Sequence, residues 1–212
     1  MVKLIVILFL NHIKMSLKAT IRKACSEFDL IPEVRKKKLH LLVSFIKEKK
    51  EKVNLIFICT HNSRRSHMAQ IWAQIAAHHY GFSNVNCYSG GTETTAFFPS
   101  AIKTLEKQGL TIIKITETEN PIYIAKYDNT SPPIVSFSKE YNHSFNPQKK
   151  FAVIMTCNQA DLSCPLIPNT EKRISIQYSD PKSADETSKE LKEYHDISAQ
   201  ICREMFFVFS RI

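Results

Sequence analysis

Short apolar runs alternate along this chain with longer segments in which apolar residues recur at helical spacing. One apolar run covers residues 53–58, and another covers residues 151–156. A run that is apolar at nearly every position is typical of a strand buried on both faces, as in a parallel sheet. Because such strands alternate with amphipathic segments, the pattern predicts an α/β fold with a small parallel β-sheet flanked by helices.

The same reading places the remaining elements of this fold. The expected strands lie at residues 85–89 and 173–178, and the expected helices at residues 66–80, 99–109 and 186–209. Pro99 near the start of one helix and Gly109 at its end have the positions that these residues favour at helix termini. Residues 116–149 contain several prolines and no regular pattern, so no element is assigned to them.

Residues 16–50 form a helical segment that precedes the first strand. Pro32 is expected to divide it into two helices, and the second has one apolar face made by Leu39, Leu42, Val43 and Ile46. Such a face usually packs on the main domain, and the alternative is a lid or a partner-binding element. We therefore expect an N-terminal helical extension at residues 1–52 and the main domain at residues 53–212.

Composition narrows the possible classes of protein. The 212 residues carry a net charge of +9 that is spread along the chain, with dense basic runs at residues 35–38 and 47–52, but no zinc-finger or RNA-binding signature accompanies them. We expect a solvated basic face and no nucleic-acid partner. The apolar run at residues 4–10 is too short to span a bilayer and lacks a signal-peptide cleavage site, so no membrane role is expected.

Cysteine usage points to a reducing compartment. The chain has six cysteines without a repeated spacing, and its length is sufficient for a core without disulfides. We therefore expect a cytoplasmic protein, monomeric, with reactive or buried thiols. Cys25, Cys87 and Cys202 lie among apolar neighbours and are interpreted as core residues.

The polar loop between the first strand and the following helix carries the candidate chemistry. It reads Cys59-Thr60-His61-Asn62-Ser63-Arg64-Arg65-Ser66. Main-chain N–H groups between a strand and a helix N-terminus form a cradle for an anion, and they favour a thiolate at Cys59. Arg65 offers a planar fork for two oxyanion oxygens, Ser66 can donate to the thiolate, and Asn62 suits a left-handed turn. The alternative is a structural cysteine near a surface arginine.

Three further residues extend this candidate site. A thiolate that attacks phosphorus or arsenic needs a proton donor for the departing oxygen, and Asp180, followed by Pro181, is the best candidate. Cys157 follows the strand at residues 151–156, and Cys164 comes seven positions later. The two thiols fit a disulfide relay, but they fit two unrelated buried thiols as well. No histidine lies near them, so a metal site is not expected.

The stretch from Phe57 to Ala69 resembles the signature of the low-molecular-weight protein tyrosine phosphatase superfamily, and within it the thioredoxin-coupled arsenate reductases. Residues 89–92, the pair Cys157 and Cys164, and Asp180 with Pro181 are similar to further motifs of that group. The likeness covers roughly residues 53–210. His61 stands where the family usually has glycine, and Arg64 where a second loop cysteine is often found.

The resemblance implies a catalytic domain at residues 53–212 that converts arsenate to arsenite. It implies that Cys59 attacks arsenate, that Arg65 orients it and that Asp180 protonates the departing oxygen. It further implies that Cys157 attacks Cys59 and that Cys164 then attacks Cys157. The resulting disulfide would be reduced by thioredoxin or a similar thiol donor, with no bound cofactor.

Two other functions remain open from the sequence. A protein tyrosine phosphatase that hydrolyses phosphotyrosine or other phosphomonoesters needs only Cys59, Arg65 and Asp180. Residues 182–184, Lys-Ser-Ala, follow Asp180-Pro181 where tyrosine phosphatases of this group tend to carry aromatic residues, which counts against a tyrosine slot. A non-catalytic anion-binding module would be expected only if one of the three reactive groups were missing. In each case the substrate is a small oxyanion, arsenate or a phosphate ester.

Overall fold

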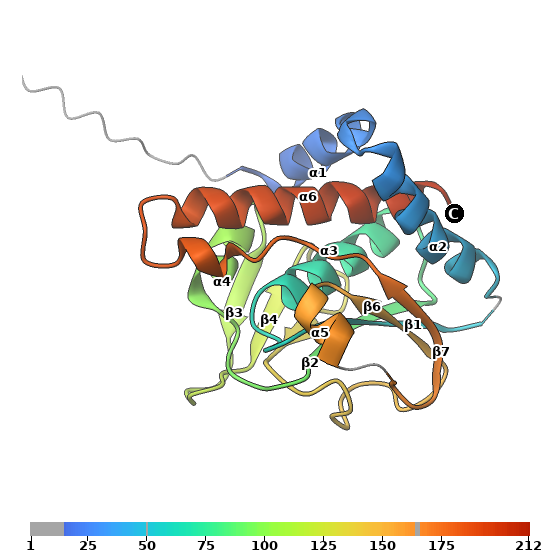
Figure 1. Cartoon of the computed structure of the whole chain (residues 1–212). Helices are drawn as coiled ribbons and strands as arrows, with labels where there is room; N and C mark the ends of the chain where they lie inside the picture. Colours follow the sequence, from blue (N-terminus) through green and yellow to red (C-terminus); the bar gives the residue numbers. More distant parts are fainter. Residues whose placement is uncertain (1–14, 50, 164–165) are drawn as a thin grey trace, which may run out of the picture.

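The computed structural model describes residues 15–49, 51–163 and 166–212 and contains the predicted parallel sheet (Figure 1). The strand order is β2 (Val85–Gly91), β1 (Val53–Cys59), β6 (Phe151–Met155) and β7 (Thr170–Ser175), and every neighbouring pair is parallel. Three strands lie where the sequence predicts them, and β7 begins three residues earlier than expected. The fold class is confirmed.

Three short strands form a second sheet that the sequence analysis did not assign. They are β3 (Thr111–Lys114), β4 (Tyr123–Lys126) and β5 (Ile134–Ser136), paired antiparallel in that order. Each has only three or four residues, at or below the shortest run in which strand alternation can be recognised. The irregular segment at residues 116–149 is therefore partly strand.

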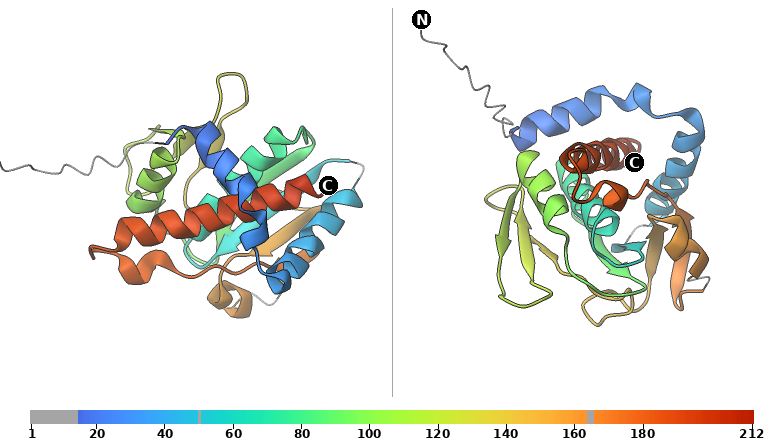
Figure 2. Two further views of the ribbon diagram at one scale, coloured as in Figure 1. Left: turned by 90° about the horizontal axis from the view of Figure 1, so that it is seen from above. Right: turned by 60° about the vertical axis from the view of Figure 1, so that its left-hand side comes forward.

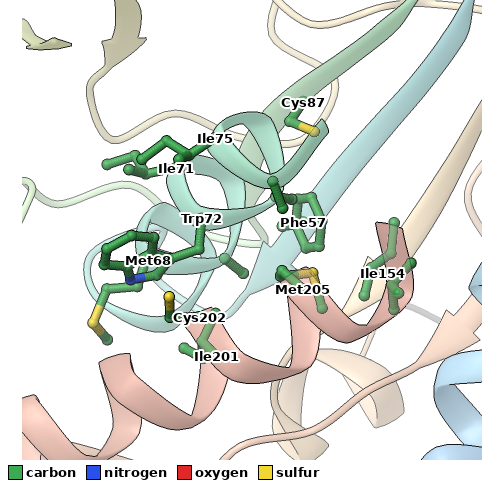
Figure 3. Close-up of a cluster of buried hydrophobic side chains, with 14 of the residues drawn as sticks. Phe57, Met68, Ile71, Trp72, Ile75, Cys87, Ile154, Ile201, Cys202 and Met205 are labelled. Carbon is green, nitrogen blue, oxygen red and sulfur yellow. The ribbon is translucent and has the colours of Figure 1, made fainter. Parts of the chain in front are cut away.

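Helices cover one face of the parallel sheet. The helix α3 (Arg65–His79) packs on β1 and β2, the long α6 (Glu190–Ser210) packs on α3, and α4 (Pro99–Lys107) lies beside them against α6 and β3. Their positions agree with the predicted ones apart from a later start of α6. The apolar side chains of α3 lie between the sheet and α6 (Figure 3). The labelled core there consists of Phe57, Met68, Ile71, Trp72, Ile75, Cys87, Ile154, Ile201, Cys202 and Met205.

The opposite face of the sheet carries a second, smaller apolar cluster. It includes Ile56, Ile58, Val153 and Met155 from the central strands, with Ala160 from the short helix α5 (Asn158–Ser163). Burial on both faces explains why β1 and β6 are apolar at nearly every position. Cys59 and Cys157 belong to this cluster, so both candidate thiols lie on the same side of the sheet.

The N-terminal segment folds into two helices that wrap around α6 (Figure 2). They are α1 (Leu17–Ser26) and α2 (Glu33–Lys47), joined through the 3-10 turn η1 (Phe28–Leu30), and Pro32 precedes α2 as predicted. The predicted apolar face of α2 is buried, in the same core cluster as α6. Packing on the main domain is thus confirmed for the described part of this segment.

Within the residues that the structure describes, no helix has the length and apolar character needed to cross a bilayer. The apolar run at residues 4–10 lies outside the described residues.

Candidate active site

Cys59 ends β1, and the loop that follows it leads directly into α3. Its Sγ lies 3.1 Å from the Ser66 hydroxyl oxygen, and that oxygen accepts a hydrogen bond of 2.8 Å from the Asn62 side-chain amide. Because the amide occupies an acceptor position of the hydroxyl, the Ser66 proton is free to point at the sulfur. Ser66 therefore stands ready to donate to a Cys59 thiolate.

Asn62 is the central residue of the loop. Its φ is 44°, the left-handed conformation that the sequence predicts for an asparagine here. Its Oδ1 accepts a hydrogen bond of 3.0 Å from the main-chain N–H of Lys139. Among the described residues, none accepts a hydrogen bond from the main-chain N–H groups of residues 61–64. These donors stand at the N-terminus of α3, where the helix dipole also favours an anion.

The side chains of three loop residues are engaged by the surrounding scaffold. Thr60 contacts Cys157, His61 lies 3.4 Å from the Glu93 carboxylate, and Ser63 donates to the Ala96 carbonyl oxygen at 2.7 Å. Their predicted contribution to anion binding would therefore come from their main-chain N–H groups.

Arg64 is tied to the far side of the loop. Its guanidinium donates to Asp185 and to the Tyr194 hydroxyl, each at 2.5 Å, and stacks on the Phe98 ring with 3.8 Å from Cζ to the ring centroid. The Arg64 side chain is thus engaged by Asp185, Tyr194 and Phe98, and the oxyanion contact expected of Arg64 stays a prediction. The sequence could not distinguish two adjacent arginines, because their directions depend on how the first turn of α3 begins.

Arg65 and Asp180 are brought together across 115 positions of sequence. The Arg65 guanidinium donates to Asp180 Oδ2 at 2.6 Å and to the Tyr178 carbonyl oxygen at 3.1 Å. Asp180 also accepts from the Lys182 N–H and so begins the 3-10 turn η2 (Pro181–Ala184). The predicted oxyanion fork and the predicted proton donor are therefore neighbours at one edge of the sheet.

Cys157 follows β6 and lies beside the loop. Its Sγ is 3.5 Å from the Thr60 hydroxyl oxygen and accepts a hydrogen bond from the Ala160 N–H at 3.3 Å. Only 1% of its surface is exposed. Cys164, the other predicted thiol of the relay, lies outside the described residues.

Comparison with known proteins agrees with this geometry. Arsenate reductases from Staphylococcus aureus (strain Newman) and Bacillus licheniformis are each 31% identical, over 61% and 66% of this chain and over 79% and 81% of their own lengths. Residues 54–130 match the family model of the low molecular weight phosphotyrosine protein phosphatases. The chain belongs to this family. The two arsenate reductases named above are relatives of this chain within that family.

A solved structure extends the likeness to the fold. A mutant of YwlE from Bacillus subtilis superposes with a TM-score of 0.51 at 16% identity, over 75% of this chain and 97% of that one. The N-terminal helices α1 and α2 of this chain lie outside residues 54–130, the part that matches the family model.

Two buried basic residues behind the loop were missed by sequence reasoning. His67, on α3, contacts the Ser89 hydroxyl and stacks on Phe97 at 4.2 Å between ring centroids, and burial holds its pKa well below the usual range. Burial also lowers the pKa of Lys139, to about 7. The family signature includes His67 but gives it no role, and Lys139 lies in the segment without a recognisable pattern.

No group of histidine, cysteine or carboxylate side chains suited to a metal ion occurs in the described parts of the chain. A cavity of about 300 Å³ adjoins the loop, bounded by His61, Arg64, Phe97, Phe98 and Lys182. The reactive groups of the candidate site are thus the Cys59 thiol, the Arg65 guanidinium and the Asp180 carboxyl group.

Proposed function

We propose that this protein reduces arsenate to arsenite through Cys59. The observation that carries the proposal is the position of the Cys157 thiol, buried beside the loop and 3.5 Å from the side chain of the residue that follows Cys59. Hydrolysis of a phosphate ester requires one cysteine, whereas the reduction of arsenic needs two electrons from thiols. The arsenate reductases among the relatives support this choice.

The first step is attack on the oxyanion. The arsenate oxygens bind to the loop N–H groups and to Arg65, and the Cys59 thiolate forms a bond to arsenic. Asp180 gives a proton to the departing oxygen, which leaves as water. Ser66 and the helix dipole stabilise the thiolate before the attack, which is supported by the 3.1 Å contact between Ser66 Oγ and Cys59 Sγ.

The next steps move electrons to arsenic. The Cys157 thiolate attacks Cys59 Sγ, so that a disulfide forms, the sulfur–arsenic bond breaks and its electron pair leaves with arsenic as arsenite. Cys164 then attacks Cys157 Sγ and frees Cys59. The Cys157–Cys164 disulfide is finally reduced by a dithiol of a thioredoxin-like partner, which itself becomes a disulfide.

Mass spectrometry of trapped thiols tests the relay. The reduced protein is exposed briefly to arsenate, alkylated and digested, and compared with the variants Cys59→Ser, Cys157→Ser and Cys164→Ser. We expect a Cys157–Cys164 disulfide in the wild type, a Cys59–Cys157 disulfide in Cys164→Ser and neither in Cys59→Ser. Cys25→Ser, on α1, is the matched control and should behave as the wild type. Complete alkylation of all three thiols after arsenate exposure would refute the proposal.

Hydrolysis of phosphomonoesters is the second candidate, because the cavity of about 300 Å³ beside the loop is larger than an arsenate ion needs. An ester with a sizeable leaving group would place that group against Phe98 and Lys182. The Cys157→Ser variant separates the two activities. It should abolish arsenite production and leave hydrolysis of an aryl phosphate unchanged.

The domain boundary and the assembly state belong to the same proposal. We expect residues 53–212 to form the catalytic domain, residues 1–52 to be an extension held against α6, and the protein to act as a monomer. Light scattering at the concentration of the assay tests the last point, because a stable dimer would double the measured mass.

A further inference from the structure

A lysine side chain is buried behind the catalytic loop without a carboxylate partner among the described residues. Lys139 follows β5, and 1% of its surface is exposed. Its Nζ donates to the Phe137 carbonyl oxygen at 3.3 Å and lies over the rings of Phe137 and Phe145, at 4.5 and 5.5 Å from the ring centroids. Ring faces attract a cation, but they replace its hydration only in part.

The main chain of Lys139 is attached to the loop itself. Its N–H donates to Asn62 Oδ1 at 3.0 Å, and its carbonyl oxygen accepts from the Gly91 N–H at 2.8 Å. From Asn62 the contacts continue through Ser66 to Cys59 Sγ. Lys139 is therefore connected to the reactive sulfur through Asn62 and Ser66.

Burial of this ammonium is unfavourable for folding. Taking a charge out of water without a counter-ion costs free energy, and the pKa of Lys139 is lowered to about 7 for this reason. The charge of Lys139 also helps to lower the pKa of His67, whose ring contacts the main chain of Asn62. The charge of Lys139 thus acts on His67, directly behind the loop. Because burial of this charge is unfavourable for folding, a contribution to stability does not explain the lysine.

We propose that Lys139 is a positioning residue whose charged ammonium holds the loop of residues 59–66 in the form that binds an oxyanion. When the ammonium loses its proton, the attraction to the two rings disappears, and the segment that holds Asn62 loosens. The ammonium is charged at low pH, so oxyanion affinity is highest below about pH 7 and falls above it. The inference rests on the loop being the oxyanion site, but not on arsenate as substrate.

Other ionisable groups lie on the elements packed around Lys139. They are His67 on α3, Tyr88 on β2, His61 in the loop, and Glu140, Tyr141 and His143 in its own segment. Burial keeps His67 neutral through the working range, because its pKa is well below the usual value. Burial raises the pKa of Tyr88, so its hydroxyl keeps its proton. The binding experiment therefore needs control variants at His61 and His143.

Sulfate binding to the Cys59→Ser protein tests the proposal without catalysis. Sulfate keeps its charge between pH 5.5 and 9, and the serine removes the titration of the thiol. We expect calorimetry to show an affinity that falls about tenfold around pH 7, within the usual range of coupling between two sites. Adding Lys139→Met to the Cys59→Ser protein should lower the sulfate affinity at pH 6 about tenfold and abolish the step, which is the fall in affinity around pH 7. Lys149→Met, an exposed lysine of the same segment, should keep it.

Three outcomes overturn the proposal. The first is a Lys139→Met variant that binds sulfate with the same affinity and pH profile as the Cys59→Ser protein. The second is loss of the fall in sulfate affinity around pH 7 when His61→Asn or His143→Asn is added. If Lys139→Met does not fold, ¹³C-lysine NMR of the Cys59→Ser protein decides instead. Because linkage is reciprocal, sulfate must raise the pKa of Lys139, and an unchanged pKa is the third outcome. A failed arsenate assay affects none of these measurements, so the two proposals fail independently.

Discussion

The guanidinium of Arg35 on α2 lies 4.7 Å from the ring centroid of Tyr178, the residue whose carbonyl oxygen binds Arg65. Arg35 also holds both carboxylate oxygens of Glu204 on α6, at 2.9 and 2.7 Å. The N-terminal helices are therefore connected to Arg65, the proposed oxyanion-binding arginine, through one buried tyrosine. Tyr178 stands two positions before Asp180, so the same contact supports the segment that carries the proposed proton donor.

Loss of Arg35 should destabilise the whole protein. In Arg35→Met, the Glu204 carboxylate stays buried without its positively charged partner. Removing one member of a buried ion pair costs about 3–5 kcal/mol of unfolding free energy. Urea unfolding measures this loss, and Arg22→Met, an exposed arginine on α1, should change stability little. A loss below about 1 kcal/mol would show that the pair is solvated, as surface pairs are.

Ser66→Ala should slow the chemistry of Cys59 without unfolding the protein. The variant removes the hydroxyl that lies 3.1 Å from Sγ and leaves the Asn62 amide without this acceptor. Removal of one donor from a reactive anion typically lowers kcat by about 10²–10³-fold. Steady-state kinetics and the rate of Cys59 alkylation by iodoacetamide near pH 7 are the measurements. Ser83→Ala, at an exposed serine, should keep both rates, and equal rates in the two variants would contradict the role of Ser66.

Gly91→Ala should displace the loop because there is no room for a side chain. A Cβ at this position would lie 2.6 Å from the Thr60 carbonyl oxygen and 2.8 Å from the Asn62 nitrogen. A displacement of about 1 Å near reacting groups can cost about 10²-fold in rate, so kcat/KM should fall by at least about tenfold.

Gly81→Ala is the matched control for this clash. Gly81 has a φ of +82° but no neighbour within 4 Å of an added Cβ, so its substitution strains the main chain without pushing on the loop. It should lower stability and leave kcat/KM unchanged. If Gly91→Ala keeps full activity, the loop tolerates movement, and the close approach of β2 has no role in catalysis.

The stability of the protein should rise with pH because of Lys139. Burial lowers the pKa of this lysine from 10.5 to about 7, so between these values the unfolded chain binds a proton that the folded chain does not. Unfolding then becomes less favourable as pH increases. The stabilising effect is absent below about pH 7, where the charged ammonium is buried at a cost.

Urea titrations of Lys139→Met at several pH values check this sign. The variant should be about 1–4 kcal/mol more stable than the wild type at pH 6, and its advantage should shrink as pH rises toward 9. Lys149→Met should follow the pH dependence of the wild type. If the difference in unfolding free energy between Lys139→Met and the wild type does not change with pH, Lys139 has the same protonation in the folded and unfolded states.

The catalytic loop was predictable because its properties are local. A buried strand, a polar loop and a helix rich in apolar residues follow one another within residues 53–79, and the left-handed turn at Asn62 follows from the residue type. The direction of Arg64 was not predictable. It depends on Asp185 and Tyr194, which lie more than 100 positions away and reach the loop only through the packing of α6.

The second sheet and Lys139 were missed for a related reason. Strands of three or four residues carry no periodicity of their own, so β3, β4 and β5 become visible only through their pairing. A lysine in an irregular segment is exposed in most proteins, and here the rings of Phe137 and Phe145 and the Phe137 carbonyl oxygen surround the buried ammonium.

The sequence by itself determined the family, the parallel sheet, and the loop from Cys59 to Ser66, because contiguous residues encode strands, helices and helix N-termini. Only the tertiary structure decided which side chains meet at that loop. It joined Arg65 to Asp180, set Cys157 beside Thr60 and placed Lys139 behind Asn62. Of these three contacts, the one between Arg65 and Asp180 joins residues 115 positions apart. Such contacts arise because parallel strands end at one edge of a sheet, which pairing and packing establish together.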